Sequence, residues 1–431
     1  MRDAVFIAVM LGLLPIAVWR PFAGVLLWCW ISFMNPHRLL YGVAMELPWA
    51  AAIFAATLLG CVLTGEIRKA RADTLTLLLM ALLVCITVTS LNALGDPDAV
   101  WAKYDGVAKV ILGLIVTGAL LTDRWRIHGL VWAMVISIGY YGVRGGIFAI
   151  MTGGNYRVFG PAQTMITDNN HLAAAMLVTL PLMNYLRLQS RHRAVRIGLS
   201  VAMGLTLLAV VSSYSRGALL GLGAVVVVMW IRSRSKVLLA AVLAVVLTGA
   251  VTFMPPQWSE RMNSIGEYQE DGSATERLVL WGISWKLAVS RPMLGSGFTG
   301  PYNREVVDRV EPGGPARAVH SIWFELLGEQ GFVTFFVWLS MTLIGAFWTQ
   351  RLIWLSRGRP DLAWAGDFAR MAQVSMVAYL VSGTFLSLSY WDFYWTLLVA
   401  IGGAWGMARR AAVPAAVAQA SAPARAGWRT A

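Results

Sequence analysis

A histidine and two glutamates stand at the start of a long apolar segment, in the stretch AVHSIWFELLGEQG at residues 318–331. Histidine titrates close to neutral pH, so His320 is the natural candidate for a general base here. A plain hydrogen bond in a loop is its structural alternative. Glu325 and Glu329 stand four residues apart and share one face of a helix. Pairing with arginines suits these two carboxylates better than acid catalysis, so we expect them to position their neighbours.

The composition indicates a membrane protein. The 431 residues are 58% hydrophobic and only 13% charged, and the mean hydropathy is +0.64, whereas soluble domains carry about 25% charged residues. Apolar runs of roughly 17–25 residues recur, which is the length that crosses a bilayer. The net charge of +13 is spread over short loops, where it reports orientation, and no nucleic-acid partner is expected. The three cysteines lie inside apolar runs and should pack as apolar side chains.

An all-α polytopic fold with about twelve transmembrane helices is expected. Residues 1–34 hold two short apolar runs separated by Trp19-Arg20-Pro21, and we expect one broken crossing there. A hairpin with an outer N-terminus is the competing arrangement. The eleven clear runs are 47–64, 74–94, 101–122, 127–151, 171–188, 195–211, 215–231, 237–254, 321–349, 371–388 and 391–408.

Loops rich in lysine and arginine alternate along the chain and mark the cytoplasmic side. The longest loop, residues 255–320, then lies outside, and 274–290 within it has helical spacing. We expect that helix to lie against the membrane or to roof a cavity. Its recurring apolar positions are Leu278, Trp281, Trp285 and Ala288. The expected parts of the chain are an N-terminal bundle (1–254), the loop (255–320), C-terminal helices (321–408) and a disordered cytoplasmic tail (409–431).

Polar residues that the cytoplasmic loops do not explain gather at the outer interface, beneath the long loop. Charges inside a bilayer are costly, so their placement is informative. Transporters more often place such residues near the midplane, whereas this one-sided arrangement favours a site that acts on a lipid-linked head group. The residues concerned are Lys103, Asp105, Lys109, Arg144, Arg157, Asp168, Asn169, His171, Arg216, Arg277, His320, Glu325, Glu329 and Asp392.

Several of these side chains also have a structural interpretation. Lys103 and Arg144 suit snorkelling toward the interface. Asn169 and His171 suit the capping of a helix N-terminus. Arg277 suits a solvated position in the loop.

The chemistry that fits these residue types is glycosyl transfer from a lipid diphosphate. Arginine forks bind phosphate oxygens in pairs and hold such a leaving group, while a histidine takes the proton from an attacking sugar hydroxyl. The positive end of a helix dipole at His320 disfavours the imidazolium form. Asp96-Pro97-Asp98 has the form of a D-x-D metal motif, but such turns are common, and no metal site is expected.

Three segments together resemble the O-antigen ligase and O-antigen polymerase superfamily: SSYSRGALLG, ERLVLWGISWKLAVSRPMLGSGFTG and HSIWFELLGEQG. The resemblance covers about residues 195–349. Two earlier stretches, RPFAGVLLWCWISFMNPHRLLYG and RVFGPAQTMITDNNHLAAAM, look like the branch of O-antigen ligases and exosortase-associated O-glycosylation ligases. Order and spacing, more than any single motif, carry the match.

The resemblance implies an integral-membrane glycosyltransferase of the C type in the bacterial inner membrane, with its active site facing the periplasm. Its donor would be a glycan on undecaprenyl diphosphate and its acceptor a sugar of lipid A–core. It would use a single inverting displacement without cofactor or metal. His320 would be the base, and Arg216 and Arg277 would hold the diphosphate, with Arg261 as an alternative to Arg277. The further substrate-binding candidates are Arg144, Arg157, Lys103, Asn169, His171, Glu325 and Trp281, the last of which would stack on sugars or pack at the interface.

Other functions remain open on the sequence. A glycan polymerase, or a protein O-oligosaccharyltransferase of the same superfamily, differs only in its acceptor. A transporter or flippase for lipid-linked sugar belongs to another class, and it predicts paired internal repeats and polar residues in both halves.

Overall fold

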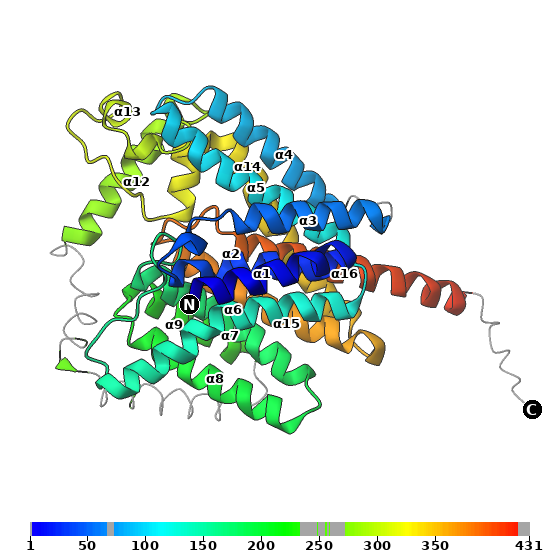
Figure 1. Ribbon diagram of the computed structural model, residues 1–431. Coiled ribbons are helices and arrows are strands. Elements are labelled where there is room, and N and C mark those ends of the chain that lie inside the picture. The colour runs from blue at the N-terminus through cyan, green and yellow to red at the C-terminus, as the bar shows by residue number, and fades with distance from the viewer. Residues whose placement is uncertain are drawn as a thin grey trace, which may run out of the picture.

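The structure is a computed structural model that describes residues 2–66, 73–232 and 272–420, with isolated positions between the last two ranges. It is all-helical, as predicted, and contains no strand in those ranges (Figure 1). The expected crossing at 237–254 and Arg261 lie outside the described residues. The long helices are α1 (Arg2–Trp19), α2 (Pro21–Met34), α3 (Trp49–Leu63), α4 (Thr74–Leu91), α5 (Pro97–Leu120), α6 (Arg124–Thr152), α7 (Asn169–Gln189), α8 (Arg193–Val211), α9 (Arg216–Arg232), α12 (Gly272–Ser290), α14 (Ile322–Leu355), α15 (Ala363–Gly383) and α16 (Asp392–Ala420). The short ones are α13 (Arg304–Asp308) and the 3₁₀ turns Pro36–Leu39, Val43–Met45, Gly300–Tyr302 and Pro360–Leu362.

Five described helices are long and apolar enough to cross a membrane, namely α1, α4, α6, α8 and α14. α2, α3 and α9 are shorter apolar helices. α4 shows why such helices need lipid: Leu79 and Leu82 are buried in the bundle, while Leu77 and Val84 are exposed on its outer face. A helix that is apolar on all sides is stable only when both faces avoid water. The chain is therefore a multi-pass membrane protein.

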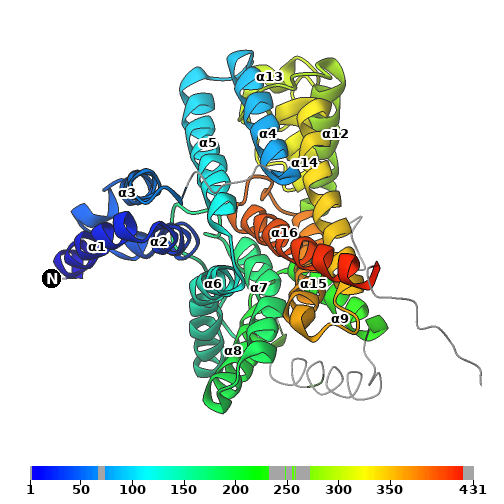
Figure 2. The same ribbon diagram turned by 90° about the vertical axis from the view of Figure 1, so that its right-hand side faces the viewer.

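Residues 2–34 form an antiparallel hairpin, so the single broken crossing expected in residues 1–34 is wrong. The Phe6 ring centroid lies 6.3 Å from that of Trp30, which places the start of α1 beside the end of α2. Figure 2 shows α1, α2 and α3 side by side. Pro21 occupies the first turn of α2, where its missing N–H costs nothing, while Pro15 stays inside α1. The Arg2 end of α1 therefore lies with the segment 35–46.

α16 is the central helix. Its residues 392–402 are all buried, and it contacts α14, α5, α15, α6 and α2. Figure 2 shows it between α4, α5, α12 and α14 on one side and α6, α7 and α8 on the other. Because its first residue is Asp392, the bundle places a buried carboxylate at the start of its central helix.

α12 confirms the helix expected at 274–290, but only part of the predicted stripe is buried. Leu278 and Trp285 are exposed, whereas Ile283 and Leu287 are buried, and α12 packs along α14. The buried side of α12 is therefore set by its packing against α14 and is not the side on which the largest apolar side chains recur.

A break inside α14 binds the loop that follows α12 through backbone hydrogen bonds. Gly331 adopts φ 73° within the helix, a conformation that glycine adopts without strain. The carbonyls of Gly328 and Glu329 there accept the backbone N–H groups of Ser296 (2.9 Å) and Gly297 (2.7 Å). The turn sequence GSGFTG is thus fixed against α14, and this contact positions Glu329.

Candidate active site

The loop between α15 and α16, residues 384–391, is where the start of α14 is held. The backbone N–H of His320 donates to Ser387 Oγ at 3.0 Å. Ser389 Oγ donates to Glu325 Oε2 at 2.7 Å. The first turn of α14 and the residue before it are therefore fixed by one loop.

The same loop reaches α9 and α12. A β-carbon added at Gly217 would lie 3.5 Å from Phe385 Cβ, so Arg216, its neighbour, begins α9 beside this loop. The ring centroid of Trp281 lies 6.3 Å from that of Phe385. Segments around Arg216, Trp281 and His320 therefore meet at the loop, although more than 60 positions separate Arg216 from Trp281 in the sequence.

Asp168 and His171 form a pair at the start of α7. The Asp168 carboxylate accepts the backbone N–H groups of Asn170 (2.7 Å) and His171 (2.8 Å) and also contacts His171 Nδ1. Burial acts to raise the pKa of Asp168, but these hydrogen bonds outweigh it and lower the pKa to about 2. Asp168, rather than Asn169 or His171, is the cap, and it fixes the orientation of the His171 ring.

His320 lies within electrostatic reach of Arg277, His171, Asp168 and Glu325. Burial, the largest influence, lowers the pKa of His320 below its usual value, and the positive charge of Arg277 lowers it further. The two carboxylates act in the opposite direction. The ring is thus neutral at neutral pH, which is the form that accepts a proton.

Asn169 joins α7 to the segment before α9. Its Nδ2–H donates to the backbone oxygen of Ser213 at 2.6 Å. Ser215 Oγ accepts the backbone N–H of Ala218 at 3.2 Å and so caps α9. Arg216, the first residue of α9, is half-buried and stands at a helix N-terminus, a position that favours phosphate.

Lys103 bridges α5 to α14. Its Nζ lies 2.8 Å from Glu329 Oε1 and 3.4 Å from Glu325 Oε1. Tyr390 donates its hydroxyl to Glu329 Oε2 at 2.8 Å, and the Thr299 backbone N–H donates to Glu329 Oε1 at 3.0 Å. The two glutamates therefore fix neighbouring segments, as expected, but their cation is a lysine rather than an arginine.

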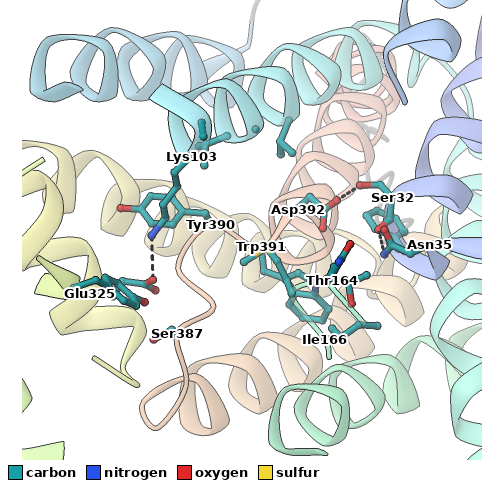
Figure 3. Close-up of a pocket in the computed structure, with 18 residues that line it drawn as sticks. Ser32, Asn35, Lys103, Thr164, Ile166, Glu325, Ser387, Tyr390, Trp391 and Asp392 are labelled. Atoms are coloured by element: carbon teal, nitrogen blue, oxygen red, sulfur yellow. Dashed lines mark hydrogen bonds and ion pairs between the residues drawn. The ribbon is translucent and has the colours of Figure 1, made fainter. Parts of the chain in front are cut away.

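A cavity of about 690 Å³ lies beside this cluster, between α2, α5, α14 and α16. Figure 3 shows Lys103 and Glu325 at one end of it and Asp392 with Ser32 at the other. Ser387, the hydroxyl that holds His320, also lines the cavity. The candidate base is thus coupled to the cavity wall.

Arg144 and Arg157 share a separate pocket of about 320 Å³ between α6 and the segment that follows it. The Arg157 guanidinium lies 5.9 Å from the centroid of the Tyr214 ring, two residues before Arg216. Arg144 also borders an almost wholly apolar groove of about 520 Å³ along α6 and α8. Neither arginine lines the larger cavity.

Left-handed backbone conformations gather at these places. Within the described ranges five non-glycine residues have positive φ, and such conformations concentrate at functional sites. They are Asn35 (50°), Gln163 (58°), Tyr214 (58°), Thr299 (61°) and His320 (52°). Asn35 and Gln163 line the large cavity. Thr299 belongs to the glutamate cluster through its backbone N–H, Tyr214 lies two residues before Arg216, and His320 is the candidate base.

Trp281 has a packing role in the structure. Its ring stacks on Phe324 with centroids 5.3 Å apart, and its Nε1–H donates to the backbone oxygen of Val319 at 3.1 Å. The contact holds α12 against the residue before His320. The D-P-D element is a helix start, because Asp96 caps α5 by accepting the Asp98 backbone N–H at 3.3 Å.

Among the groups that line the cavity, Ser32, Ser387 and Tyr390 were not singled out from the sequence. Ser32 contacts Asp392, which is 360 residues away in the sequence. Ser387 contacts His320, which is 67 residues away in the sequence. Tyr390 also lines the cavity, together with Tyr302, which the sequence does offer as a residue that could stack on a sugar. Asp392 itself stands out in the sequence as a carboxylate at the start of a strongly apolar helix, but its partner Ser32 does not.

Comparison with known families now bears on this geometry. Residues 201–339 match the O-antigen ligase family, and this segment contains Arg216, Arg277 and His320. This match to residues 201–339 supports the O-antigen ligase superfamily. Residues 1–191 match DUF5935, a family of unknown function. No curated protein matches the chain. The O-antigen ligase domain confirms the predicted superfamily and indicates a glycosyltransferase-type enzyme of lipopolysaccharide biosynthesis, which acts on a lipid-linked glycan and a lipid acceptor.

Proposed function

We propose that this O-antigen ligase superfamily member transfers a preassembled glycan from undecaprenyl diphosphate to a hydroxyl of lipid A–core. The acceptor oxygen forms a bond to the anomeric carbon while the bond from that carbon to the diphosphate oxygen breaks. The hydroxyl proton passes to the ring of His320, and the electron pair leaves with the diphosphate. Attack opposite the leaving group inverts the anomeric centre.

The observation that carries this proposal is the setting of His320. Its ring is half-buried, its backbone is held in a left-handed conformation by Ser387, and its pKa is lowered by burial and by Arg277. A neutral imidazole beside a cation suits a base that faces an anionic donor.

The arginines supply the charge that the leaving group needs. Arg277 lies within electrostatic reach of His320, and Arg216 stands at the N-terminus of α9, so both suit the diphosphate oxygens. Arg144 and Arg157 are proposed as helpers at their own pocket. The apolar groove that Arg144 borders suits the polyprenyl chain of such a donor. With these fixed cations, the reaction is proposed to need no metal.

The site is proposed to face the periplasm, with the chain in the inner membrane. The lysine- and arginine-rich loops mark the opposite side. The α1–α2 hairpin replaces one expected crossing with two, which sets the Arg2 end of α1 on the outer side together with residues 35–46.

A reconstituted transfer assay tests the proposal. Purified protein, undecaprenyl-diphosphate glycan and lipid A–core would be combined in liposomes with EDTA, and the product resolved by gel mobility. The wild type should form product, and Arg216→Ala should lose it by at least about a hundredfold, on the scale of removing one oxyanion donor. Arg187→Ala, at the other end of α7, is the matched control and should keep full activity. No wild-type product with lipid A–core, but product with a protein or glycan acceptor, would replace the ligase by an oligosaccharyltransferase or a polymerase.

A further inference from the structure

The cavity of about 690 Å³ is a partly open space with a mixed polar and apolar lining, and none of the proposed catalytic residues His320, Arg216 and Arg277 lines it. Its volume falls within the range of sites that hold small ligands. Its walls come from the end of α2, the first half of α5, the segment 163–166, and the starts of α14 and α16. Figure 3 shows Trp391 between the lysine end and the Asp392 end.

The charge of the lining argues against a diphosphate. Its ionisable residues are Lys103, Glu325, Asp392, Tyr302 and Tyr390, and no arginine lines it. Lys103 is already held by Glu325 and Glu329. An anionic leaving group would therefore meet more negative than positive charge here, whereas a neutral ligand that donates hydrogen bonds would be favoured.

Asp392 has unused hydrogen-bonding capacity. It is 7% exposed, and it accepts a hydrogen bond from Ser32 and the backbone N–H of Phe393. A carboxylate offers about four acceptor positions, and within the described ranges no lysine, arginine or histidine forms an ion pair with Asp392. A buried carboxylate with spare acceptor positions is stabilised by hydroxyl donors that enter the cavity.

Aromatic side chains complete the lining. Phe33, Tyr302, Tyr390 and Trp391 all border the cavity, and their apolar faces suit the C–H face of a sugar ring. Carboxylates that accept from hydroxyls, together with aromatic faces, form a combination that suits a neutral carbohydrate.

The cavity also adjoins the base. Ser387 borders the cavity and holds the His320 backbone, while Arg277 acts on the same ring from α12. We propose that this cavity binds the terminal sugar of the acceptor, with Asp392 and Glu325 accepting hydrogen bonds from its hydroxyls, and that it presents one hydroxyl to His320. This inference rests on the proposed function, since it names the acceptor half of the same site.

Two variants test it from opposite walls. Asp392→Asn keeps the side-chain volume but removes the charge. Gly106→Leu fills the space: Gly106 lines the cavity, a β-carbon there meets nothing within 4 Å, and leucine favours a helix more than glycine does. The matched controls are Asp105→Asn, at an exposed carboxylate on α5, and Gly198→Leu, at a helical glycine of α8 with the same free space.

In the transfer assay both cavity variants should raise the acceptor KM at least about tenfold while the donor KM changes less than about twofold, and both controls should match the wild type. A rise in the donor KM with an unchanged acceptor KM would overturn the inference.

A binding arm separates this inference from the proposed function. Core oligosaccharide released from lipid A would be titrated without donor and followed by microscale thermophoresis. Binding to the wild type that Gly106→Leu abolishes would support the cavity as the sugar site, even if no transfer occurred and the proposed function failed. Equal binding to wild type and Gly106→Leu would overturn it, even if transfer were active.

Discussion

The backbone N–H of His320 donates a 3.0 Å hydrogen bond to the hydroxyl of Ser387, and this contact ties the start of α14 to a loop 67 residues further on. His320 holds a positive φ of 52°, which costs roughly 1 kcal/mol or more and persists only where the surrounding contacts fix it. Ser387 is one of the groups that fix it.

Ser387→Ala should therefore reduce catalysis more than stability. Loss of one hydrogen bond is worth about 1 kcal/mol, so kcat should fall about fivefold as His320 leaves its orientation. Ser200→Ala, at an exposed serine of α8, is the control. An unchanged kcat for Ser387→Ala would show that the ring needs no such support.

The acid limb of the pH profile should report His320. Protonation removes the base, so kcat/KM falls as the pH drops through the pKa of His320. Because burial and Arg277 lower that pKa, the midpoint should lie below pH 6.5, the ordinary value.

Substitutions of the neighbours should shift this limb in opposite directions. Arg277→Gln removes a charge that lowers the pKa of His320, so the limb of its residual activity should move to higher pH. Asp168→Asn removes a charge that raises the pKa, so the limb should move to lower pH. Shifts of the same sign in both variants would rule out His320 as the titrating group.

The Lys103 cluster should dominate stability at the start of α14. Lys103→Met removes the cation that pairs with both Glu329 and Glu325. The Glu329 side chain is 0% exposed, so its charge is then left without a partner inside the bundle. Breaking a buried ion pair in this way costs about 3–5 kcal/mol, so thermal unfolding in detergent should move to clearly lower temperature. Lys109→Met, which breaks an exposed pair with Asp105, should change the midpoint little, because such pairs contribute about 0–1 kcal/mol. Equal effects of the two variants would contradict the account of the cluster.

The α1–α2 hairpin can be tested by labelling in intact cells. Arg2→Cys should react with a membrane-impermeant maleimide that has entered the periplasm, as should Tyr41→Cys at a side chain that is 94% exposed. Arg20→Cys, at the turn between α1 and α2, should stay unlabelled. Labelling of position 20 with protection of position 2 would reverse the proposed orientation.

Much of the fold follows from the sequence because apolar runs of crossing length specify helices directly. Apart from the run at 237–254, each expected run overlaps a helix, although α15 spans Ala363–Gly383 where the run 371–388 was expected. The α1–α2 hairpin was harder to predict, since two short runs around Arg20 fit either one broken helix or two antiparallel ones. The choice depends on packing against α3, such as the 5.6 Å approach of Phe6 to Trp49, and the local pattern does not encode such contacts.

The residue types of the candidate site could be predicted from the sequence, but the contacts between those residues could not. His320, Arg216 and Arg277 stand out because polar groups at the ends of apolar helices are costly. The cavity depends on pairings such as Lys103 with Glu329, 226 residues apart, and Ser32 with Asp392. Only the folded bundle brings these partners together.

Single-turnover transfer by His320→Gln tests the central claim most directly. With donor and acceptor saturating, loss of a general base should slow the transfer step by about 10²–10⁴-fold, while donor binding stays within about twofold of the wild type. His192→Gln, at the α7–α8 turn, is the matched control. A His320→Gln rate within about threefold of the wild type would contradict the account, because the acceptor proton would then pass to another group.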